Sequence, residues 1–337
     1  CYLPFDKSRN VKKFLDIVNP CMAFFIKYEF WKNYLDELHK RRIPVYSISS
    51  ISAADKYSSS GMAVRTDMCC ATSTICLCRM NAPNAIGEDR YQRVTVVGDT
   101  RFDRVLQIRE EAKHLPLVEL FKNNTMTFVA GSSWQPDEDL FIEYFNQHPE
   151  VKWVIAPHVI DENHLVEIIR KLKRPYVRYT RADEKNVRKA DCLIIDCFGL
   201  LSSIYRYGEI AYIGGGFGVG IHNTLEAAVY GIPVIFGPKY QKFQEAIQLL
   251  EAKGAFSVKD YEELKTLLDR MLTDEAFARI SMNASNYVTG NAGATDKIMS
   301  MINFRKVKSD KSDRAVKVME WHPFIALPFW GALSPFI

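Results

Sequence analysis

The sequence has 337 residues, of which 47% are hydrophobic and 25% charged, the balance of an ordinary globular protein. This length suits two domains of about 150 residues each. The net charge of +4 and the pI of 8.5 favour an anionic ligand or a membrane surface, and they exclude the strongly basic footprint of a nucleic-acid-binding protein.

Cysteine and histidine spacing gives no sign of a metal centre. Four of the eight cysteines fall within residues 69–78, and no CxxC pair occurs anywhere in the chain. We therefore expect reduced thiols and no bound metal.

The first part of the chain alternates helical and strand-like patterns. Apolar periodicity predicts helices at Asn10–Val18, Trp31–Lys40 and about Phe102–Lys113, and strands at Met22–Lys27, Pro44–Ser49 and Val94–Val97. Residues 51–90 have no stable period, so we expect them to lie outside any sheet domain.

A second, more regular series begins at Met126. The pattern predicts strands at Met126–Ala130, Val151–Ala156, Cys192–Asp196, Ile210–Ile213 and Pro233–Phe236, and helices at Leu140–Asn146, Glu162–Leu172 and Asn223–Tyr230. This alternation is typical of a doubly wound parallel sheet, which binds ligands beyond the carboxyl ends of its strands. One crevice should therefore be lined by four loops, Gly131–Trp134, Pro157–His158, Cys197–Leu200 and Gly214–His222.

A glycine-rich loop follows the strand Ile210–Ile213 and leads into a helix. Glycines let backbone amides approach a phosphate, and a helix beginning near Asn223 would direct its free N–H groups at that anion, with Glu226 accepting hydrogen bonds from a ribose diol. A second interpretation stays open, in which the glycines form only a tight turn and Asn223 and Glu226 form a capping box. A dinucleotide fingerprint is excluded, because Val219 and Ile221 stand where it needs a third glycine.

Four ordered motifs resemble the bacterial Kdo transferases, which move 3-deoxy-D-manno-octulosonic acid (Kdo) from CMP-Kdo to lipid A in lipopolysaccharide synthesis. The motifs are Tyr28–Asn33, Val97–Asp103, Ala130–Trp134 and Gly214–Pro238. The resemblance implies an α/β GT-B fold with two Rossmann-like domains, an incomplete acceptor-side domain at 1–125 and a CMP-sugar donor domain at 126–303. It also implies an inverting, metal-independent transfer that needs no cofactor.

The resemblance assigns roles to individual residues. The CMP contacts carry over to Pro157, His158, Phe198, Gly199, Leu200, Asn223, Thr224, Leu225 and Glu226. Glu29 and Arg101 match residues that support the transition state, although both also fit solvated ends of a strand and a loop. His158 replaces the family's usual arginine with a titratable group.

Three further segments of the sequence each allow two interpretations. Ser132 and Ser133 suit either a sugar carboxylate or phosphate, or, more simply, the cap of the helix after Pro136. Residues 51–90 suit a divergent loop or an out-of-frame translation, since codons permitted for them spell family-like text in another frame. Residues 304–337 form a basic and aromatic tail, which suits a foreign extension or a weak membrane-surface anchor.

The family's general base lies in a motif that has no counterpart in this sequence. We therefore expect the chain to bind CMP without transferring Kdo. The expected partners are CMP-Kdo, a lipid A precursor and the cytoplasmic face of the inner membrane, and no nucleic acid. The alternatives are a nonenzymatic nucleotide-binding fragment and another GT-B nucleotide-sugar enzyme.

Overall fold

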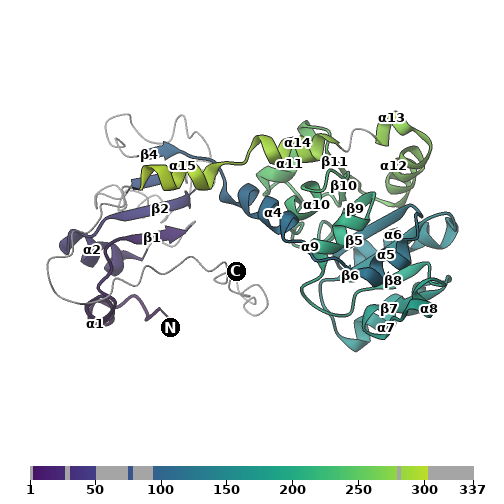
Figure 1. Cartoon of the computed structure of the whole chain (residues 1–337), viewed down its shortest axis with the longest axis horizontal. Helices are drawn as coiled ribbons and strands as arrows, with labels where there is room; N and C mark the ends of the chain where they lie inside the picture. The colour runs from purple at the N-terminus through teal and green to yellow at the C-terminus, as the bar shows by residue number, and fades with distance from the viewer. Residues whose placement is uncertain (1–2, 27–30, 51–74, 79–93, 279–281, 303–337) are drawn as a thin grey trace. The chain divides into compact units, whose positions relative to one another are not determined.

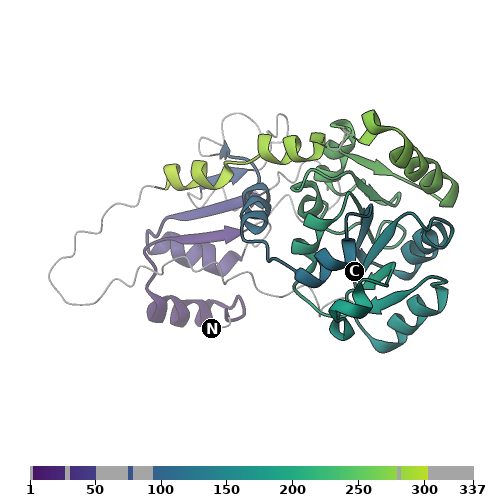
Figure 2. The same ribbon diagram turned by 45° about the vertical axis from the view of Figure 1, so that its right-hand side comes forward.

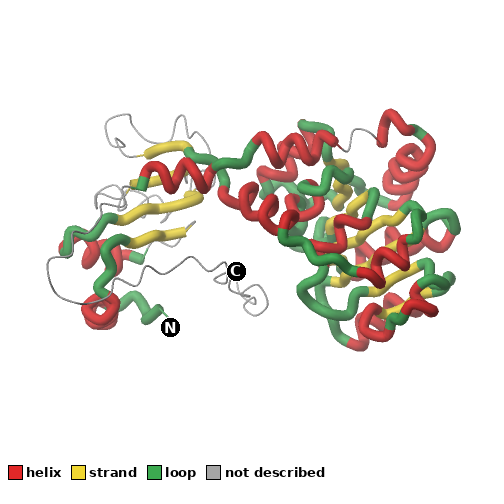
Figure 3. The backbone as a smooth tube through the Cα atoms, in the orientation of Figure 1, coloured by secondary structure: helices red, strands yellow, loops and turns green. Residues whose placement is uncertain are grey.

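The structure is a computed structural model that describes residues 3–26, 31–50, 75–78, 94–278 and 282–302 (Figures 1 and 3). The chain divides into a unit Cys1–Ser300, which holds two parallel sheets, and a unit Met301–Ile337. Glu29 and the tail at 304–337 lie outside the described residues. None of the described helices combines the length and the hydrophobicity that a transmembrane span needs.

The first sheet has four parallel strands in the order β1-β2-β3-β4. These strands are β1 (Ala23–Ile26), β2 (Val45–Ser50), β3 (Ile75–Cys78) and β4 (Val94–Val96). Helices α1 (Ser8–Val18) and α2 (Lys32–Lys40) supply Val11, Leu15 and Leu35 to a small core that includes Val45 of β2.

One expectation for this region is wrong. Residues 51–90 do contribute to the sheet, because Ile75–Cys78 forms β3 between β2 and β4. Four apolar residues carry too short a pattern to indicate a strand, and here the pairing with two neighbouring strands defines it. The rest of that segment lies outside the described residues.

The second sheet has seven strands, all parallel, in the order β11-β10-β9-β5-β6-β8-β7. These are β5 (Thr127–Ser133), β6 (Lys152–Pro157), β7 (Tyr176–Arg178), β8 (Cys192–Ile194), β9 (Ile210–Ile213), β10 (Val234–Phe236) and β11 (Ala255–Ser257). From β5 the chain builds the sheet in one direction, and from β9 it builds in the other. The boundary between β5 and β9 is therefore a topological switch point, where sheets of this type bind ligands.

Both faces of the second sheet are covered, as two views of the ribbon show (Figures 1 and 2). Phe128 packs in one cluster with Phe141 and Trp153, whereas the next residue, Val129, packs in the other with Phe236. Successive side chains of a strand point to opposite faces, so burial on both faces produces the continuous apolar runs seen in the sequence.

The helices around this sheet follow the chain in order. They are α4 (Thr100–Glu110), α5 (Pro116–Lys122), α6 (Gln135–Gln147), α7 (Glu162–Lys171), α8 (Glu184–Val187), α9 (Leu201–Ile204), α10 (Leu225–Ala228), α11 (Gln244–Glu251), α12 (Tyr261–Thr273), α13 (Glu275–Ala278), α14 (Met282–Gly290) and α15 (Ala294–Met301), with 3₁₀ turns at Tyr179–Arg181 and Tyr205–Tyr207. Although α4 and α5 precede residue 126, α4 contacts α9, α10 and α14, and α5 contacts α8. The domain boundary at residues 125 and 126 stays a prediction.

The junction between β5 and α6 differs from expectation. Strand β5 continues through Ser133, which pairs with Pro157 of β6, so Ser132 and Ser133 belong to the strand. Neither serine caps α6, because Trp134 is its N-cap residue and Asp137 supplies the capping carboxylate. Ser133 instead donates a 2.9 Å hydrogen bond to Glu138.

Candidate functional site

Three of the four predicted loops meet at the switch point. The backbone N–H of Gly214 donates to the Gly131 carbonyl at 2.9 Å, which joins the end of β9 to the end of β5. The N–H of His158 donates to the Ser133 carbonyl at 2.9 Å, which joins the end of β6 to the same place. These two backbone hydrogen bonds thus connect the loops after β5, β6 and β9 at the carboxyl edge of the sheet.

Three aromatic rings from these loops stack there, and we call Trp134, His158 and His222 the aromatic cluster. The centroids of Trp134 and His158 lie 4.6 Å apart, and those of His158 and His222 lie 4.3 Å apart at an interplanar angle of 22°. The indole Nε1 of Trp134 donates to Nε2 of His222 at 3.0 Å.

Both histidines of the aromatic cluster are neutral at pH 7. Burial lowers the pKa of His158. Burial, and next the proximity of His158, lower the pKa of His222 to about 4. The His158 ring therefore presents no cation at neutral pH, whereas an arginine would.

Close backbone packing accounts for two glycines of the loop after β9. A Cβ atom on Gly214 would lie 2.2 Å from the carbonyl oxygen of Ser132, and one on Gly216 would lie 2.5 Å from the backbone nitrogen of Gly237. Gly215 has a φ of +93°, in the left-handed region that favours glycine. These positions support the tight-turn interpretation, while phosphate binding by the loop stays a prediction.

Asp137 connects the two sides of the switch point, and the sequence patterns did not single it out. Its buried carboxylate accepts hydrogen bonds from the N–H of Trp134 at 3.0 Å, from the N–H of Gly215 at 2.9 Å and from the Tyr212 hydroxyl at 3.0 Å. Burial raises the pKa of Asp137, and these three donors oppose that rise. Its place at the third position of α6 was the one local signal available, and that signal indicates only a cap.

The predicted ribose-binding segment is arranged differently from expectation. Helix α10 begins at Leu225, two residues later than predicted, and has only four residues. Asn223 lies before the helix, where its Nδ2 donates to Glu226 at 2.9 Å and its Oδ1 accepts from the N–H of Leu225 at 3.2 Å. Burial raises the pKa of Glu226, against the hydrogen bond from Asn223.

The side chains of Thr224 and Leu225, which lie between Asn223 and Glu226, are buried. The side chain of Leu225 is buried in the core, so only its backbone is available to a ligand. Thr224 is fully buried, and its hydroxyl is among the buried polar atoms that have no partner in the described residues.

The remaining predicted CMP contacts follow the neighbouring strands. Pro157 is the last residue of β6, and Phe198, Gly199 and Leu200 follow β8, which pairs with β6. Phe198 is 81% exposed, Gly199 has a φ of +82°, and Leu200 packs against the core. An exposed phenylalanine at this edge is available to a flat apolar ligand, and CMP contact by this loop stays a prediction.

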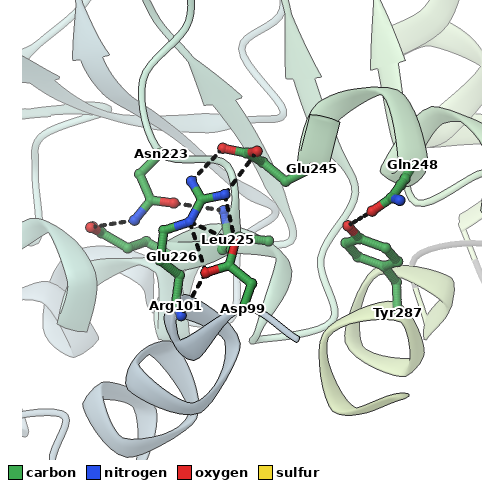
Figure 4. Close-up of polar contacts among 8 residues, drawn as sticks. All are labelled: Asp99, Arg101, Asn223, Leu225, Glu226, Glu245, Gln248 and Tyr287. Carbon is green, nitrogen blue, oxygen red and sulfur yellow. Dashed lines mark hydrogen bonds and ion pairs between the residues drawn. The ribbon is translucent and has the colours of Figure 1, made fainter. Parts of the chain in front are cut away.

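Arg101, at the start of α4, is held by two acidic side chains (Figure 4). Its guanidinium donates to Asp99 at 2.8 Å and to Glu245 of α11 at 2.7 Å. Burial by itself lowers the pKa of Arg101, but the hydrogen bonds to Glu245 and Asp99 outweigh it and raise the pKa. Both carboxylates are largely buried, so the cation is compensated in this structure. Its catalytic role stays a prediction.

The ion pairs of Arg101 line a small pocket. Gln248 and Tyr287 also line it, and the Tyr287 hydroxyl donates to Gln248 at 2.7 Å (Figure 4). Glu245 was missed from the sequence because it lies 144 residues from Arg101 and follows no local pattern. Among the described residues, no group of three or more His, Cys, Asp or Glu side chains is arranged to hold a metal ion.

Comparison with known proteins identifies similar sequences. A protein-family model described as 3-deoxy-D-manno-octulosonic-acid transferase (kdotransferase) matches residues 1–104. The 3-deoxy-D-manno-octulosonic acid transferase of Aquifex aeolicus is 27% identical over 277 residues, which cover 80% of this chain and 71% of that protein. The Haemophilus influenzae enzyme of the same name is 22% identical over 320 residues, covering 89% and 73% respectively. The resemblance carried by the four sequence motifs is confirmed.

A solved structure supports the fold. UDP-GlcNAc 2-epimerase from Neisseria meningitidis bound to UDP-GlcNAc matches with a TM-score of 0.59 and covers 87% of this chain and 80% of that chain. At 13% identity this likeness concerns the fold alone. The predicted α/β GT-B fold is confirmed.

Proposed function

Because the chain is a relative of the bacterial Kdo transferases over most of its length, we propose that it is a Kdo transferase that takes Kdo from CMP-Kdo and acts in lipopolysaccharide synthesis. The observation that carries this proposal is the joining of the Ala130–Trp134 and Gly214–Pro238 motifs at one switch point of a parallel sheet. This is where sheets of this type bind nucleotides.

The acceptor in this proposal is a lipid A precursor. Its hydroxyl attacks the anomeric carbon of Kdo while the bond to the CMP phosphate oxygen breaks, so the configuration inverts. The proton of the hydroxyl passes to a base, and the electron pair of the broken C–O bond stays on the phosphate oxygen, which becomes more negative as CMP leaves. The reaction uses no metal ion, and a cation near the phosphate stabilises the leaving CMP.

Arg101 is the proposed source of that cation. Asp99 and Glu245 accept hydrogen bonds from Nε, Nη1 and Nη2 of its guanidinium, so a phosphate would bind the remaining N–H of Nη1 or displace one of the carboxylates. Glu29 is the second proposed transition-state residue.

For nucleotide recognition, we propose that Glu226 accepts hydrogen bonds from the ribose diol and that Phe198 contacts the base. The raised pKa of the Glu226 carboxyl reflects burial without a compensating cation, and ribose hydroxyls are donors that would stabilise its charged form. The site of action is the cytoplasmic face of the inner membrane, since the acceptor is a membrane lipid and the chain is mildly basic.

Isothermal titration with CMP and with UDP tests the donor assignment. We expect CMP to bind more tightly, whereas equal or tighter binding of UDP would overturn the cytidine assignment. Incubation with CMP-Kdo and a lipid A precursor, with and without EDTA, then tests transfer by the mass of the lipid product. CMP binding without any product would agree with the expectation, drawn from the missing general-base motif, that this chain holds the nucleotide but does not transfer Kdo, and would favour the alternative of a nonenzymatic nucleotide-binding fragment.

A further inference from the structure

The hydrogen bond between Trp134 and His222 fixes where the imidazole carries its proton. The indole Nε1 of tryptophan is only a donor, so the His222 Nε2 that lies 3.0 Å from it must be the acceptor. A neutral imidazole has one N–H and one bare nitrogen. The proton of His222 therefore sits on Nδ1, and the ring is held in that tautomer by Trp134.

The surroundings of His222 hold the ring in one orientation. The His158 ring stacks on the His222 ring with the centroids 4.3 Å apart. The backbone N–H of His222 donates to the Gly214 carbonyl at 3.2 Å. A Cβ atom on Gly215 would lie only 3.2 Å from Cδ2 of His222, so the glycine leaves the ring its space. The pKa of about 4 keeps the ring neutral throughout the physiological range.

The Nδ1–H group of His222 is available to a ligand. No described residue accepts a hydrogen bond from it. The atom is also not among the buried side-chain atoms that lack a partner, which means that it is not fully buried. The group is thus a donor within reach of solvent at the switch point, in the loop between β9 and α10. A preoriented donor with no protein acceptor is suited to an oxygen atom supplied from outside.

We propose that His222 binds the donor substrate by donating its Nδ1–H to a phosphate oxygen of the nucleotide-activated sugar, and that Trp134 is a positioning residue that fixes the His222 tautomer. The inference rests on the proposed function for the identity of the ligand. The tautomer itself is a property of the free protein. Recognition of the phosphate here uses a neutral donor in the aromatic cluster.

The tautomer is tested by long-range ¹H–¹⁵N spectra of histidine-labelled protein without ligand. We expect the His222 signals of an Nδ1–H imidazole in the wild-type protein. Trp134→Phe keeps an aromatic ring for stacking but removes the indole donor, so we expect a mixture of both tautomers. An Nε2–H imidazole in the wild-type protein, or an unchanged spectrum in Trp134→Phe, would overturn the positioning role.

Ligand binding is tested by titration with CMP and with cytidine, which lacks the phosphate. His222→Ala should weaken CMP binding about tenfold, the usual worth of a hydrogen bond to a charged group, and leave cytidine binding unchanged. His222→Asn, whose amide nitrogen can occupy the place of Nδ1, should recover part of the loss. His114→Ala, at an exposed histidine of another loop, is the matched control and should bind CMP as the wild type does.

The two proposals fail in different ways. Unchanged CMP affinity in His222→Ala, in a protein with a wild-type unfolding midpoint, would overturn the role of His222 while leaving the proposed function intact. An equal loss for CMP and cytidine would also overturn it, since the phosphate would then not be the partner. Absence of CMP binding by the wild-type protein would instead overturn the proposed function.

Discussion

The carboxylate of Asp137 accepts a 2.9 Å hydrogen bond from the backbone N–H of Gly215, which lies 78 residues later in the chain. The same oxygen, Oδ2, accepts the N–H of Trp134. One buried atom therefore joins the loop after β5 to the loop after β9. The geometry of the aromatic cluster depends on this junction, because Trp134 and His222 belong to these two loops.

Removal of the Asp137 carboxylate should destabilise the protein. Asp137→Ala leaves two backbone N–H groups without their acceptor, which costs at least about 2 kcal/mol in the free energy of unfolding. Asp137→Asn should cost much less, because its amide oxygen can accept from the N–H groups and its amide nitrogen can donate to Tyr212. Urea unfolding of the three proteins checks this order, and equal losses for both variants would contradict it.

The glycine loop should tolerate a methyl group at one position and reject it at another. Gly216→Ala would place Cβ 2.5 Å from the backbone nitrogen of Gly237, so the two segments must separate, and we expect a loss of more than about 2 kcal/mol. Gly218→Ala is the control, since its Cβ would meet nothing closer than 3.6 Å, at the Gly215 carbonyl oxygen. Thermal and urea unfolding measure both, and a tolerated Gly216→Ala would show that the loop backbone yields easily.

Loss of charge at Glu245 should destabilise the contact between α4 and α11. Glu245→Gln leaves the partly exposed Arg101 with one charged partner instead of two, which we expect to cost roughly 1–3 kcal/mol. Glu251→Gln, at the exposed end of the same helix, should change the free energy of unfolding by less than about 0.5 kcal/mol. A similar effect of the two substitutions in urea unfolding would mean that the ion pair between Arg101 and Glu245 adds no stability.

Glu226→Gln should weaken CMP binding. The amide keeps the shape of the side chain but removes the charge-assisted acceptance from ribose, so we expect a loss of about 1.5–3 kcal/mol in binding free energy. Isothermal titration measures this loss, with 2′-deoxy-CMP as a ligand that already lacks one hydroxyl. A loss below about 0.5 kcal/mol in a folded variant would favour the capping interpretation, in which Glu226 serves only Asn223 and the start of α10.

His164 should make stability depend on pH. Its Nδ1 lies 2.9 Å from the Val159 carbonyl and its Nε2 lies 2.9 Å from the buried Glu138 carboxylate, so both nitrogens face acceptors and the doubly protonated ring fits best. Burial lowers the pKa of His164, but the hydrogen bond to Glu138 and the charge of that carboxylate outweigh it and raise the pKa.

The raised pKa sets the direction of the effect. The stabilisation is complete below the unfolded-state pKa of about 6.5 and is lost as the pH rises through the folded-state value. The difference in free energy of unfolding between the wild type and His164→Gln should therefore be larger at about pH 6 than at about pH 9. His114→Gln, at an exposed histidine, is the control, and a difference for His164→Gln that does not vary with pH would contradict the assignment.

The sequence predicted the layout of the second sheet better than the contacts within the site. Strands such as Ile210–Ile213 are buried on both faces, so they appear in the sequence as continuous apolar runs that are easily recognised. The loops after β5, β6 and β9 followed from that pattern, because the carboxyl ends of parallel strands share one edge. The GT-B fold and the family resemblance followed from the motifs themselves.

What the sequence did not predict depends on contacts between distant residues. The bond from Gly215 to Asp137 and the ion pair of Arg101 with Glu245 join segments whose spacing carries no periodic signal. The strand Ile75–Cys78 has four residues and is defined by its neighbours. Helix α10 was predicted too long because Val229 and Tyr230 continue the apolar pattern, whereas Tyr230 and Gly231 already form tighter turn-like bonds to Ala227 and Ala228.

The position of β5 at the centre of the second sheet also bears on local opening. Its backbone is hydrogen-bonded to β6 on one side and β9 on the other, and apolar clusters cover both of its faces. Central strands of this kind open with free energies close to that of global unfolding. We therefore expect the amides of β5 to be among the slowest in the chain to exchange, and the loops that follow β5 to be carried by a part of the sheet that stays folded during local opening.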